Sequence, residues 1–452
     1  MQTLKETINY ILGFQPYVML PMIIFILALV FRIKIKEALQ SSLIIGIGFI
    51  GIFTIFNFFV SKIGPALEAL VKRTGLHYNV LDVGWPPMAT MAWGFKLAPI
   101  LLLVLILLNT ALLLLKLTDT ADIDIWNYWH FIFMGAMVYN VTGNVAFTII
   151  ATVITDIVTL KLADYSARDV QNFLNLKGIS IPTLSGAVYY PFAKLMNKAI
   201  DRVPKLNKIE ANPEHIKKKL GILGEPMIIG LILGLILGIA SGYDIKITLE
   251  LAFSISAVVY ILPLMCGILT KGLMPISDGM KSFLHKKAPH LKDKHIGLDS
   301  AVILGSPSVV VTGLLLMPIA LFLAFIIPGV NFIPLGDLAN TMGFACMIVV
   351  ATRGNIIRAL IVSVPILAGK LIAASQLSAM YTSFAKDINL TFSGYNGAIT
   401  GFLDGGNLFR FWLLRVFEGR IWALILIPVI VWMIYYYRKV EMKEKLEDKN
   451  IK

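Results

Sequence analysis

The sequence contains few charged residues and few cysteines for its length. Charged side chains make up 15% of its 452 residues, whereas a typical soluble domain has about 25%. The two cysteines, Cys266 and Cys346, both lie in apolar stretches, where a thiol is usually a small core residue. The sequence has no paired set of Cys and His and no H-E-x-x-H motif, so it predicts neither a metal site nor a metalloenzyme.

Motifs that would supply energy, hold a cofactor or bind nucleic acid are also absent from the sequence. There is no G-x-x-x-x-G-K-[ST] phosphate-binding loop, and therefore no ATPase motif. No RNA- or DNA-binding motif accompanies the formal net charge of +13, and in an apolar chain such an excess of Lys and Arg is typical of cytoplasmic loops. Any transport by this chain must draw its energy from an ion gradient or from another polypeptide.

Apolar residues are abundant. They make up 57% of the chain, and the mean hydropathy is +0.79. Several apolar runs exceed roughly 18 residues, the length at which a helix crosses a bilayer. The sequence therefore predicts an all-α polytopic membrane protein with about eleven transmembrane helices, some of them broken. One break is expected at Thr142-Gly143-Asn144, inside an apolar run from Trp129 to Leu160 that is too long for one span.

Four clusters of basic residues set the expected orientation. The clusters lie at residues 32–36, 194–219, 271–294 and 438–439. Because positively charged loops tend to stay in the cytoplasm, we predict that the N-terminus is outside and the C-terminus is cytoplasmic. Three cations, Lys62, Lys72 and Arg73, then fall on the outer face. They either break this statistical rule or belong to a segment that folds back into the protein.

Two halves of the sequence resemble each other. The stretch "LPMIIFILALV" from Leu20 resembles "EPMIIGLILGL" from Glu225, and "LDVGWPP" from Leu81 resembles "LDSAVILGSP" from Leu298. Four such matches occur in the same order at offsets between 205 and 217 residues, and the first pair runs in opposite directions by the charge argument. This pattern predicts two inverted repeats with a substrate site where they meet. Chance similarity between apolar helices is the alternative.

The repeats divide the chain into five expected segments. Residues 1–190 form the first repeat and residues 224–410 the second, and a basic cytoplasmic linker at 191–223 joins them. Residues 411–437 form the last transmembrane helix, and residues 438–452 form a cytoplasmic tail.

The stretch "VLDVGWPPM", Val80 to Met88, places a carboxylate and two helix breakers just before a long apolar run. Charge and irregular backbone are tolerated at membrane depth where they are buried in protein or line water. Asp82 would accept hydrogen bonds from hydroxyl groups, and the flat ring of Trp85 would pack on C–H groups. A sugar or polyol would suit this combination, and an ordinary extracellular loop is the alternative.

Other polar residues occur in similar apolar settings. Asp299 lies in the matching stretch of the second half, Asp337 lies in "PLGDLAN", and His130 opens an apolar span after "DIWNYW". We expect these side chains to join the same site. Glu225 stands at another span start, where the helix dipole alone also favours an acidic residue.

Two further stretches suit the tips of re-entrant hairpins. The stretch "GISIPTLSG", Gly178 to Gly186, contains Thr183 and Ser185 and is too short to cross a membrane. The stretch "SGYNGAITGFLDGGN", Ser393 to Asn407, has a similar late place in the second half. Its glycines suit tightly packed backbone, and a flexible loop is the alternative.

A series of motifs makes the chain similar to a known family. In order from Ile45 to Ile361 they are "IGIGFIGI", "LDVGWP", "DIWNYWH", "ARDVQNFLNLKGISIP", "GEPMIIGLILGLILGIASGYD", "IGLDSAVILG", "PLGDLA" and "RGNIIRALI". With these motifs the chain resembles the galactitol-type membrane component, enzyme IIC, of the phosphoenolpyruvate-dependent sugar phosphotransferase system, in the ascorbate–galactitol superfamily. The number and order of the motifs make the resemblance specific to the family, and residues after about Met380 match less clearly.

The resemblance implies eleven spans in two inverted repeats with re-entrant hairpins, in a homodimer surrounded by the lipid of a bacterial cell membrane. It implies an elevator-type motion of a mobile core domain against an arm-like dimerising domain. It also implies separate IIA and IIB subunits that relay phosphate, through a cysteine of IIB, to a polyol held by this translocating subunit. The basic segments would then face phosphorylated IIB, whose encounter positive charge favours.

The resemblance also implies a substrate site. Its residues are Asp82, Trp85, His130, Thr183, Ser185, Asp299 and Asp337, with His130 or Glu225 assisting at the acceptor hydroxyl. Some relatives have a His where this chain has Thr183 and Ser306, so the particular polyol stays open. We expect uptake of galactitol or a related alditol coupled to its phosphorylation. An ion-coupled secondary transporter of a small polar solute is the alternative, and a lipid-processing enzyme would lack a nucleophile or metal set.

Overall fold

The structure is a computed structural model that describes residues 16–75, 79–209, 211–287, 294–390, 392, 397–428 and 431–432. This part of the chain is mostly helical. Five of its helices are long and apolar enough to cross a membrane, or six with the bent pair α4 (Trp85–Gly94) and α5 (Ala98–Leu114) as one span. These helices fit the expected membrane protein, and the count of eleven spans stays a prediction.

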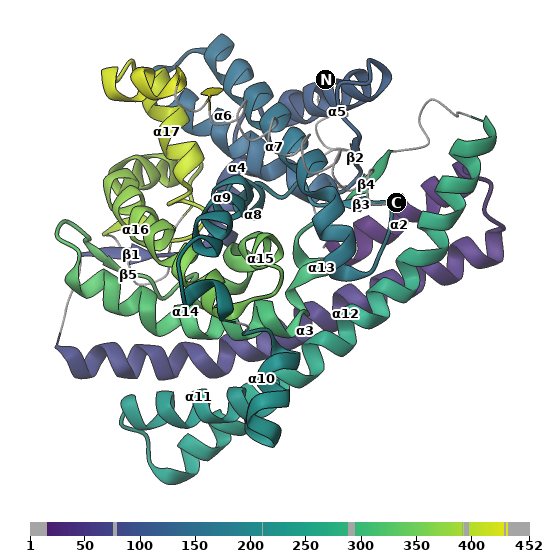
Figure 1. Cartoon of the computed structure of the whole chain (residues 1–452). Helices are drawn as coiled ribbons and strands as arrows, with labels where there is room; N and C mark the ends of the chain where they lie inside the picture. The colour runs from purple at the N-terminus through teal and green to yellow at the C-terminus, as the bar shows by residue number, and fades with distance from the viewer. Residues whose placement is uncertain are drawn as a thin grey trace.

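Four helices form an elongated group on one side of the molecule. The long helices α3 (Ile35–Thr74) and α12 (Ile245–Lys287) pack along each other, and α2 (Pro16–Val30) and α11 (Pro226–Ala240) pack against them. Figure 1 shows this four-helix group crossing beneath the other elements and extending beyond them. Both long helices continue from an apolar middle into charged ends, which explains why they exceed the length that a bilayer needs.

Arg73, one of the three cations expected on the outer face, lies against the end of a neighbouring helix. Its Nη1 donates hydrogen bonds to the carbonyl oxygens of Ala240 (2.9 Å) and Ile239 (3.3 Å). A cation at a helix C-terminus satisfies free carbonyls and meets the negative end of the helix dipole. This contact within the protein gives a reason for one exception to the charge rule.

Small residues allow α11 to approach α12 closely. Gly230, Gly234 and Gly238 are spaced four residues apart and are the buried residues of α11. A Cβ atom added at Gly234 would lie 2.4 Å from the Cα of Ala252 on α12. Such a spacing of small residues lets backbones pack together where lipid offers no hydrophobic driving force.

A valine at position 234 should therefore loosen the four-helix group. We expect Gly234→Val to destabilise the protein by about 1–3 kcal/mol, because the added side chain forces α11 away from α12. Thermal denaturation of the detergent-solubilised protein measures the effect. Gly267→Val on α12 is the matched control, because a Cβ there has no neighbouring atom within 4 Å. Equal melting temperatures for the two variants would contradict this account of the packing.

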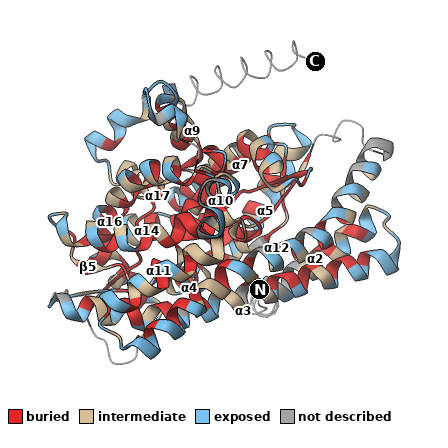
Figure 2. Ribbon diagram, turned by 60° about the horizontal axis from the view of Figure 1, so that its bottom comes forward, coloured by how far each residue is buried: buried red, intermediate tan, exposed pale blue. Residues whose placement is uncertain are grey.

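The other helices form the body of the molecule, in which Figure 2 shows most of the buried residues. Every residue from Tyr128 to Val138 on α6 (Tyr128–Thr142) and every residue of α15 (Thr341–Ala351) is buried. The remaining helices are α7 (Val145–Leu174), α8 (Leu184–Ala187), α9 (Tyr190–Asp201), α10 (Pro213–Leu220), α13 (Ala301–Leu304), α14 (Pro307–Ile326), α16 (Ile356–Asp387) and α17 (Leu408–Phe417). Short 3-10 turns lie at Ile125–Asn127, Leu206–Lys208, Gly221–Gly224 and Leu338–Asn340.

The predicted break at residues 142–144 is confirmed, and the same arrangement occurs a second time. Gly143 has a left-handed backbone (φ 64°), and the side chain of Asn144 caps α7 by accepting a backbone hydrogen bond at 3.1 Å. Before α16, Gly354 has φ 76° and Asn355 accepts a corresponding bond at 3.1 Å. Glycine adopts this conformation without steric cost, and the asparagine satisfies a free N–H of the first turn.

Six short strands that were not expected form two parallel three-stranded sheets. The first sheet has the order β5-β1-β6, with β5 at Phe332–Ile333, β1 at Val80–Asp82 and β6 at Ala398–Thr400. The second has the order β2-β4-β3, with β2 at Thr120–Asp122, β4 at His295–Gly297 and β3 at Ile179–Ser180. In the first sheet Val80 lies opposite Phe332 and Ala398, and in the second Ile296 lies opposite Ala121 and Ile179. Because parallel strands end at a common edge, the loops that follow them bring polar side chains together.

Candidate functional site

A cavity lies where loops that follow strands of both sheets meet the starts of α4 and α6, and Ile52 of α3 in the four-helix group also lines it. It has about 670 Å³ of space free of protein atoms, part of it open to solvent. Its lining includes Trp85, Trp129, His130, Thr183, Asp299 and Asp404. Five of the predicted site residues line it, namely Trp85, His130, Thr183, Ser185 and Asp299.

One wall of the cavity is aromatic. The rings of Trp85 and Trp129 are stacked with centroids 6.5 Å apart, and Trp126 meets Trp85 edge-on at 6.3 Å. Trp85 begins α4, whereas Trp126 lies in the 3-10 turn before α6 and Trp129 in the first turn of α6, so two different segments build this wall. Flat apolar faces of this kind pack against the C–H groups of a small solute while leaving its polar groups to other walls.

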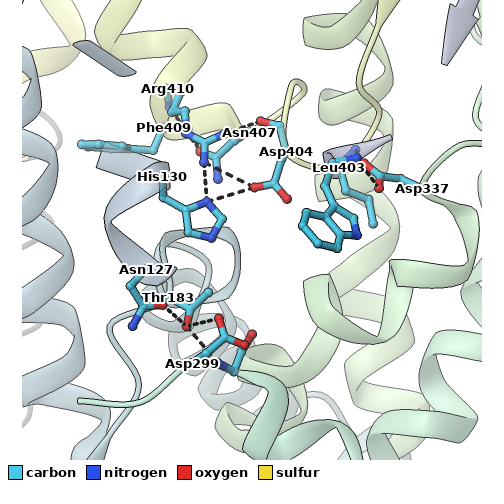
Figure 3. A network of polar contacts seen from close by, with 12 residues as sticks. Asn127, His130, Thr183, Asp299, Asp337, Leu403, Asp404, Asn407, Phe409 and Arg410 are labelled. Carbon is cyan, nitrogen blue, oxygen red and sulfur yellow. Dashed lines mark hydrogen bonds and ion pairs between the residues drawn. The ribbon is translucent and has the colours of Figure 1, made fainter. Parts of the chain in front are cut away.

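His130 contacts a buried ion pair beside the aromatic wall (Figure 3). Its Nδ1 lies 2.7 Å from Nη2 of Arg410 and 3.4 Å from Oδ1 of Asp404. The same Nη2 lies 3.3 Å from Oδ1 of Asp404, and Nη1 donates to the backbone oxygen of Asp404 at 2.6 Å. Arg410 is fully buried, and Asp404 is nearly so. A buried cation and a buried carboxylate neutralise each other here, next to the imidazole.

Asp404 and Arg410 were not among the predicted site residues. They belong to "LDGGN" and the α17 helix that follows, in which Asn407 caps the helix by accepting from the backbone N–H of Arg410 at 3.2 Å. A Cβ added at Gly406 would lie 2.4 Å from the backbone oxygen of Lys370, so only glycine fits at position 406. The glycines of this stretch indicated tightly packed backbone in the sequence. The same composition suits a flexible loop equally well, so it did not single out Asp404 or Arg410.

Thr183 and Asp299 form a polar corner on the side nearest β3 and β4. The hydroxyl of Thr183 lies 2.9 Å from Oδ1 of Asn127 and 3.3 Å from Oδ2 of Asp299, and it accepts from the backbone N–H of Ser300 at 2.9 Å. Oδ1 of Asp299 accepts the N–H of Ala301 at 2.7 Å. A carboxylate has about four acceptor positions, so Asp299 keeps acceptor capacity for a ligand in the cavity it lines.

Asp82 and Asp337 lie outside the lining of the cavity and hold its loops together. The carboxylate of Asp82 accepts backbone hydrogen bonds from Gly84 (3.2 Å), Phe402 (2.9 Å) and Asp337 (3.3 Å). The carboxylate of Asp337 accepts those of Trp85 (2.8 Å) and Leu403 (3.1 Å). Both are buried. Asp337 therefore holds the backbone at Trp85 and at Leu403, the neighbour of Asp404. Trp85 and Asp404 both line the cavity.

Glu225 lies away from these groups. It precedes α11 in the four-helix group, at the N-cap position, and does not line the cavity. Among the described residues, no three His, Cys, Asp or Glu side chains gather in a way that could hold a metal ion. The lining of the cavity offers hydrogen-bonding and aromatic groups to a ligand.

Comparison with known proteins gives consistent matches along the chain. Residues 10–395 match the family described as "PTS system sugar-specific permease component". A "PTS system galactitol-specific EIIC component" of Escherichia coli (strain K12) is 36% identical over 416 residues, which is 92% of each chain. A "Putative permease IIC component" of the same strain is 33% identical over 437 residues, 96% of this chain and all of that protein.

Proposed function

The chain belongs to the galactitol-type family of sugar-specific permease (IIC) components of the phosphotransferase system, and on that premise we propose that it imports galactitol or a related alditol for phosphorylation by a IIB subunit. The observation that carries this proposal is the cavity that joins an aromatic wall to acidic, imidazole and hydroxyl side chains. The phosphate donor would be on IIB, which IIA supplies, so this chain would be the translocating subunit of the complex.

The charges around the cavity favour a neutral polyol over an acidic sugar. Asp404 is already paired with Arg410, and Asp299 has no cation bonded to its carboxylate among the described residues. A free carboxylate accepts hydrogen bonds from hydroxyl groups, whereas it would repel an anionic solute. Trp85 and Trp129 would cover the carbon chain of an alditol, and Thr183 and Ser185 would exchange hydrogen bonds with its hydroxyl groups.

Asp82 and Asp337 take part in this proposal through the residues that they hold. Their oxygens accept five backbone N–H groups between them, including that of Trp85. They would fix the position of the aromatic wall and of the loop that carries Asp404. In this proposal Glu225 would stabilise the N-terminus of α11 through the helix dipole.

We propose that the two sheets reflect two inverted repeats. Exchanging β1 with β4, β5 with β2 and β6 with β3 converts the order β5-β1-β6 into β2-β4-β3. The same exchange relates α3 to α12 and α7 to α16, and a Gly-Asn pair precedes both α7 and α16. Loops from both sheets contribute to the cavity, as expected for a site at a repeat interface. In this proposal the two repeats are residues 1–190 and 224–410.

The four-helix group would be the arm of an elevator-type homodimer. Large apolar side chains on it are exposed in the single chain, including Ile47 (56%), Ile236 (59%) and Phe253 (66%). Such side chains suit contact with lipid or with a second copy. The body would then move against this arm and carry the cavity across the membrane.

The IIB subunit would approach from the side of the basic segment after α9. Arg202, Lys205 and Lys208 are exposed there, and a positive surface favours encounter with a phosphorylated partner. In this proposal the N-terminus would be outside and the C-terminus in the cytoplasm of a bacterial cell; both termini, including the tail at 438–452, lie outside the described residues.

The proposal is tested with the purified protein in lipid vesicles. Labelled galactitol should accumulate inside as its phosphate only when IIA, IIB, the upstream phosphate-transfer proteins and phosphoenolpyruvate are all present. Accumulation of unmodified galactitol driven by a Na⁺ or H⁺ gradient would instead establish ion-coupled secondary transport. Absence of both would reject galactitol as the substrate.

The role of Asp299 gives a sharper prediction. Asp299→Asn should weaken galactitol binding about tenfold, because an amide replaces one acceptor oxygen of a charged group with a donor. The amide oxygen can still accept from Ala301, so we expect the melting temperature to stay unchanged. Asp387→Asn, at the far end of α16, is the matched control. Unchanged affinity in Asp299→Asn, measured by equilibrium binding, would remove Asp299 from the site.

A further inference from the structure

We infer that Arg410 is a positioning residue that holds His130 as a neutral imidazole with its proton on Nε2, so that His130 faces the cavity as a hydrogen-bond donor. The state of the imidazole follows from this chain's own contacts. Only the identity of the group that receives the hydrogen bond rests on the proposed function.

The contact between the two side chains determines which nitrogen accepts. A guanidinium carries donors and no acceptor. Nη2 of Arg410 lies 2.7 Å from Nδ1 of His130, so Nδ1 must present its lone pair. A proton on Nδ1 would instead point at an N–H donor at hydrogen-bond distance. The contact therefore disfavours both the Nδ1–H tautomer and the doubly protonated ring, and it leaves the proton on Nε2.

Asp404 is the other possible partner of Nδ1 of His130, and it lies farther from Nδ1 than Arg410 does. Its Oδ1 lies 3.4 Å from Nδ1, which is 0.7 Å farther than Nη2 of Arg410. The same oxygen also lies 3.3 Å from Nη2 of Arg410. Asp404 thus contacts the guanidinium through the same oxygen, and this oxygen would accept a hydrogen bond from a protonated Nδ1 if Arg410 were removed.

The guanidinium is held rigidly in this position. It lies over the rings of Trp129 (5.5 Å) and Phe133 (5.2 Å), and Nη1 donates to the backbone of Asp404. Its side chain is fully buried, so water does not compete for its donors. Since α6 supplies His130 and α17 supplies Arg410, the packing of these two helices sets the tautomer.

The tautomer gives the cavity a direction for hydrogen bonding. Figure 3 shows the His130 ring between Asp404 and the corner formed by Thr183 and Asp299, with its second nitrogen on the side away from Arg410. A hydroxyl group placed there would accept from Nε2–H and donate its own proton to Asp299. This arrangement exposes the lone pairs of the hydroxyl oxygen in one defined direction, as a group that is to be phosphorylated requires.

Solid-state NMR of ¹⁵N-histidine-labelled protein in bilayers tests the inference. The chain has six histidines, and subtracting the spectrum of His130→Gln isolates the two ring nitrogens of His130. We expect a protonated Nε2 and an unprotonated Nδ1. In Arg410→Met the proton should move to Nδ1, where Asp404 becomes the acceptor. Arg415→Met, on the same helix and paired with Glu418, is the control that should leave the tautomer unchanged.

The outcomes separate this inference from the proposed function. A protonated Nδ1 or an imidazolium in the unaltered protein overturns the inference, as does an unchanged tautomer in Arg410→Met. If Arg410→Met does not fold, Arg410→Lys is measured in its place, because the lysine keeps a hydrogen-bond donor and should retain the Nε2–H tautomer. Loss of the Nε2–H tautomer in Arg410→Lys would also overturn the inference. Galactitol affinity should fall about tenfold in Arg410→Met and recover in part in Arg410→Lys. A protein with the expected tautomer that binds no galactitol would reject the proposed substrate alone.

Discussion

Phosphorylation-coupled uptake of galactitol should fall by about 100-fold or more in His130→Ala, because the substitution removes the donor that orients the acceptor hydroxyl. It also leaves Nη2 of Arg410 without its imidazole partner at the cavity wall. A displacement of about 1 Å at a reacting group is enough for a loss of this size. The measurement is the rate at which vesicles form labelled galactitol phosphate from external galactitol.

His215→Ala is the matched control for this prediction. His215 lies on α10, outside the cavity, and its replacement should leave the rate unchanged. Gel filtration must show that His130→Ala keeps the oligomeric state of the unaltered protein. Full activity of His130→Ala in a folded sample would mean that another residue orients the hydroxyl.

Replacing Asp404 by leucine should destabilise the protein by about 3–5 kcal/mol, because Arg410 would stay buried without its carboxylate. Arg410 has 0% exposure, so water cannot solvate the unpaired charge. The expected result is a large fall in the melting temperature of the detergent-solubilised protein, or loss of folded protein from the membrane fraction.

The double variant Asp404→Leu, Arg410→Met separates the charge effect from packing. Removing both partners eliminates the buried charge, so the double variant should be more stable than Asp404→Leu alone. If the two variants melt at the same temperature, the loss in Asp404→Leu arises from side-chain shape. The pair would then have no electrostatic role in stability.

The sequence predicted the membrane helices from apolar length, and the break at Thr142-Gly143-Asn144 because the surrounding apolar run is too long for one span. It did not predict the six strands, because two or three residues are too few to show an alternating pattern. The long helices α3 and α12 exceed an apolar span because their charged ends continue the helix where hydropathy falls. Charge patterning alone also could not place Arg73 against the end of α11.

The site was predicted in part, for reasons that concern single residues. Trp85, His130 and Asp299 stood out as polar or aromatic residues in apolar surroundings, and they line the cavity. The sequence could not show that Asp82 points at backbone N–H groups, since that direction depends on strand pairing across the whole chain. Arg410 lies inside an apolar helix, and its role depends on the packing of α17 against α6.

Each of the two sheets combines strands from both halves of the chain, and this affects when the sheets can form during synthesis. Strand β1 pairs only with strands from the second half among the described residues, and the hydrogen bond from Phe402 to Asp82 joins residues 320 positions apart. At about 5–20 residues per second, a ribosome needs roughly 16–64 s to synthesise the intervening chain. During this interval both edges of β1 lack their partner strands, so the first sheet can form only after most of the chain has been synthesised.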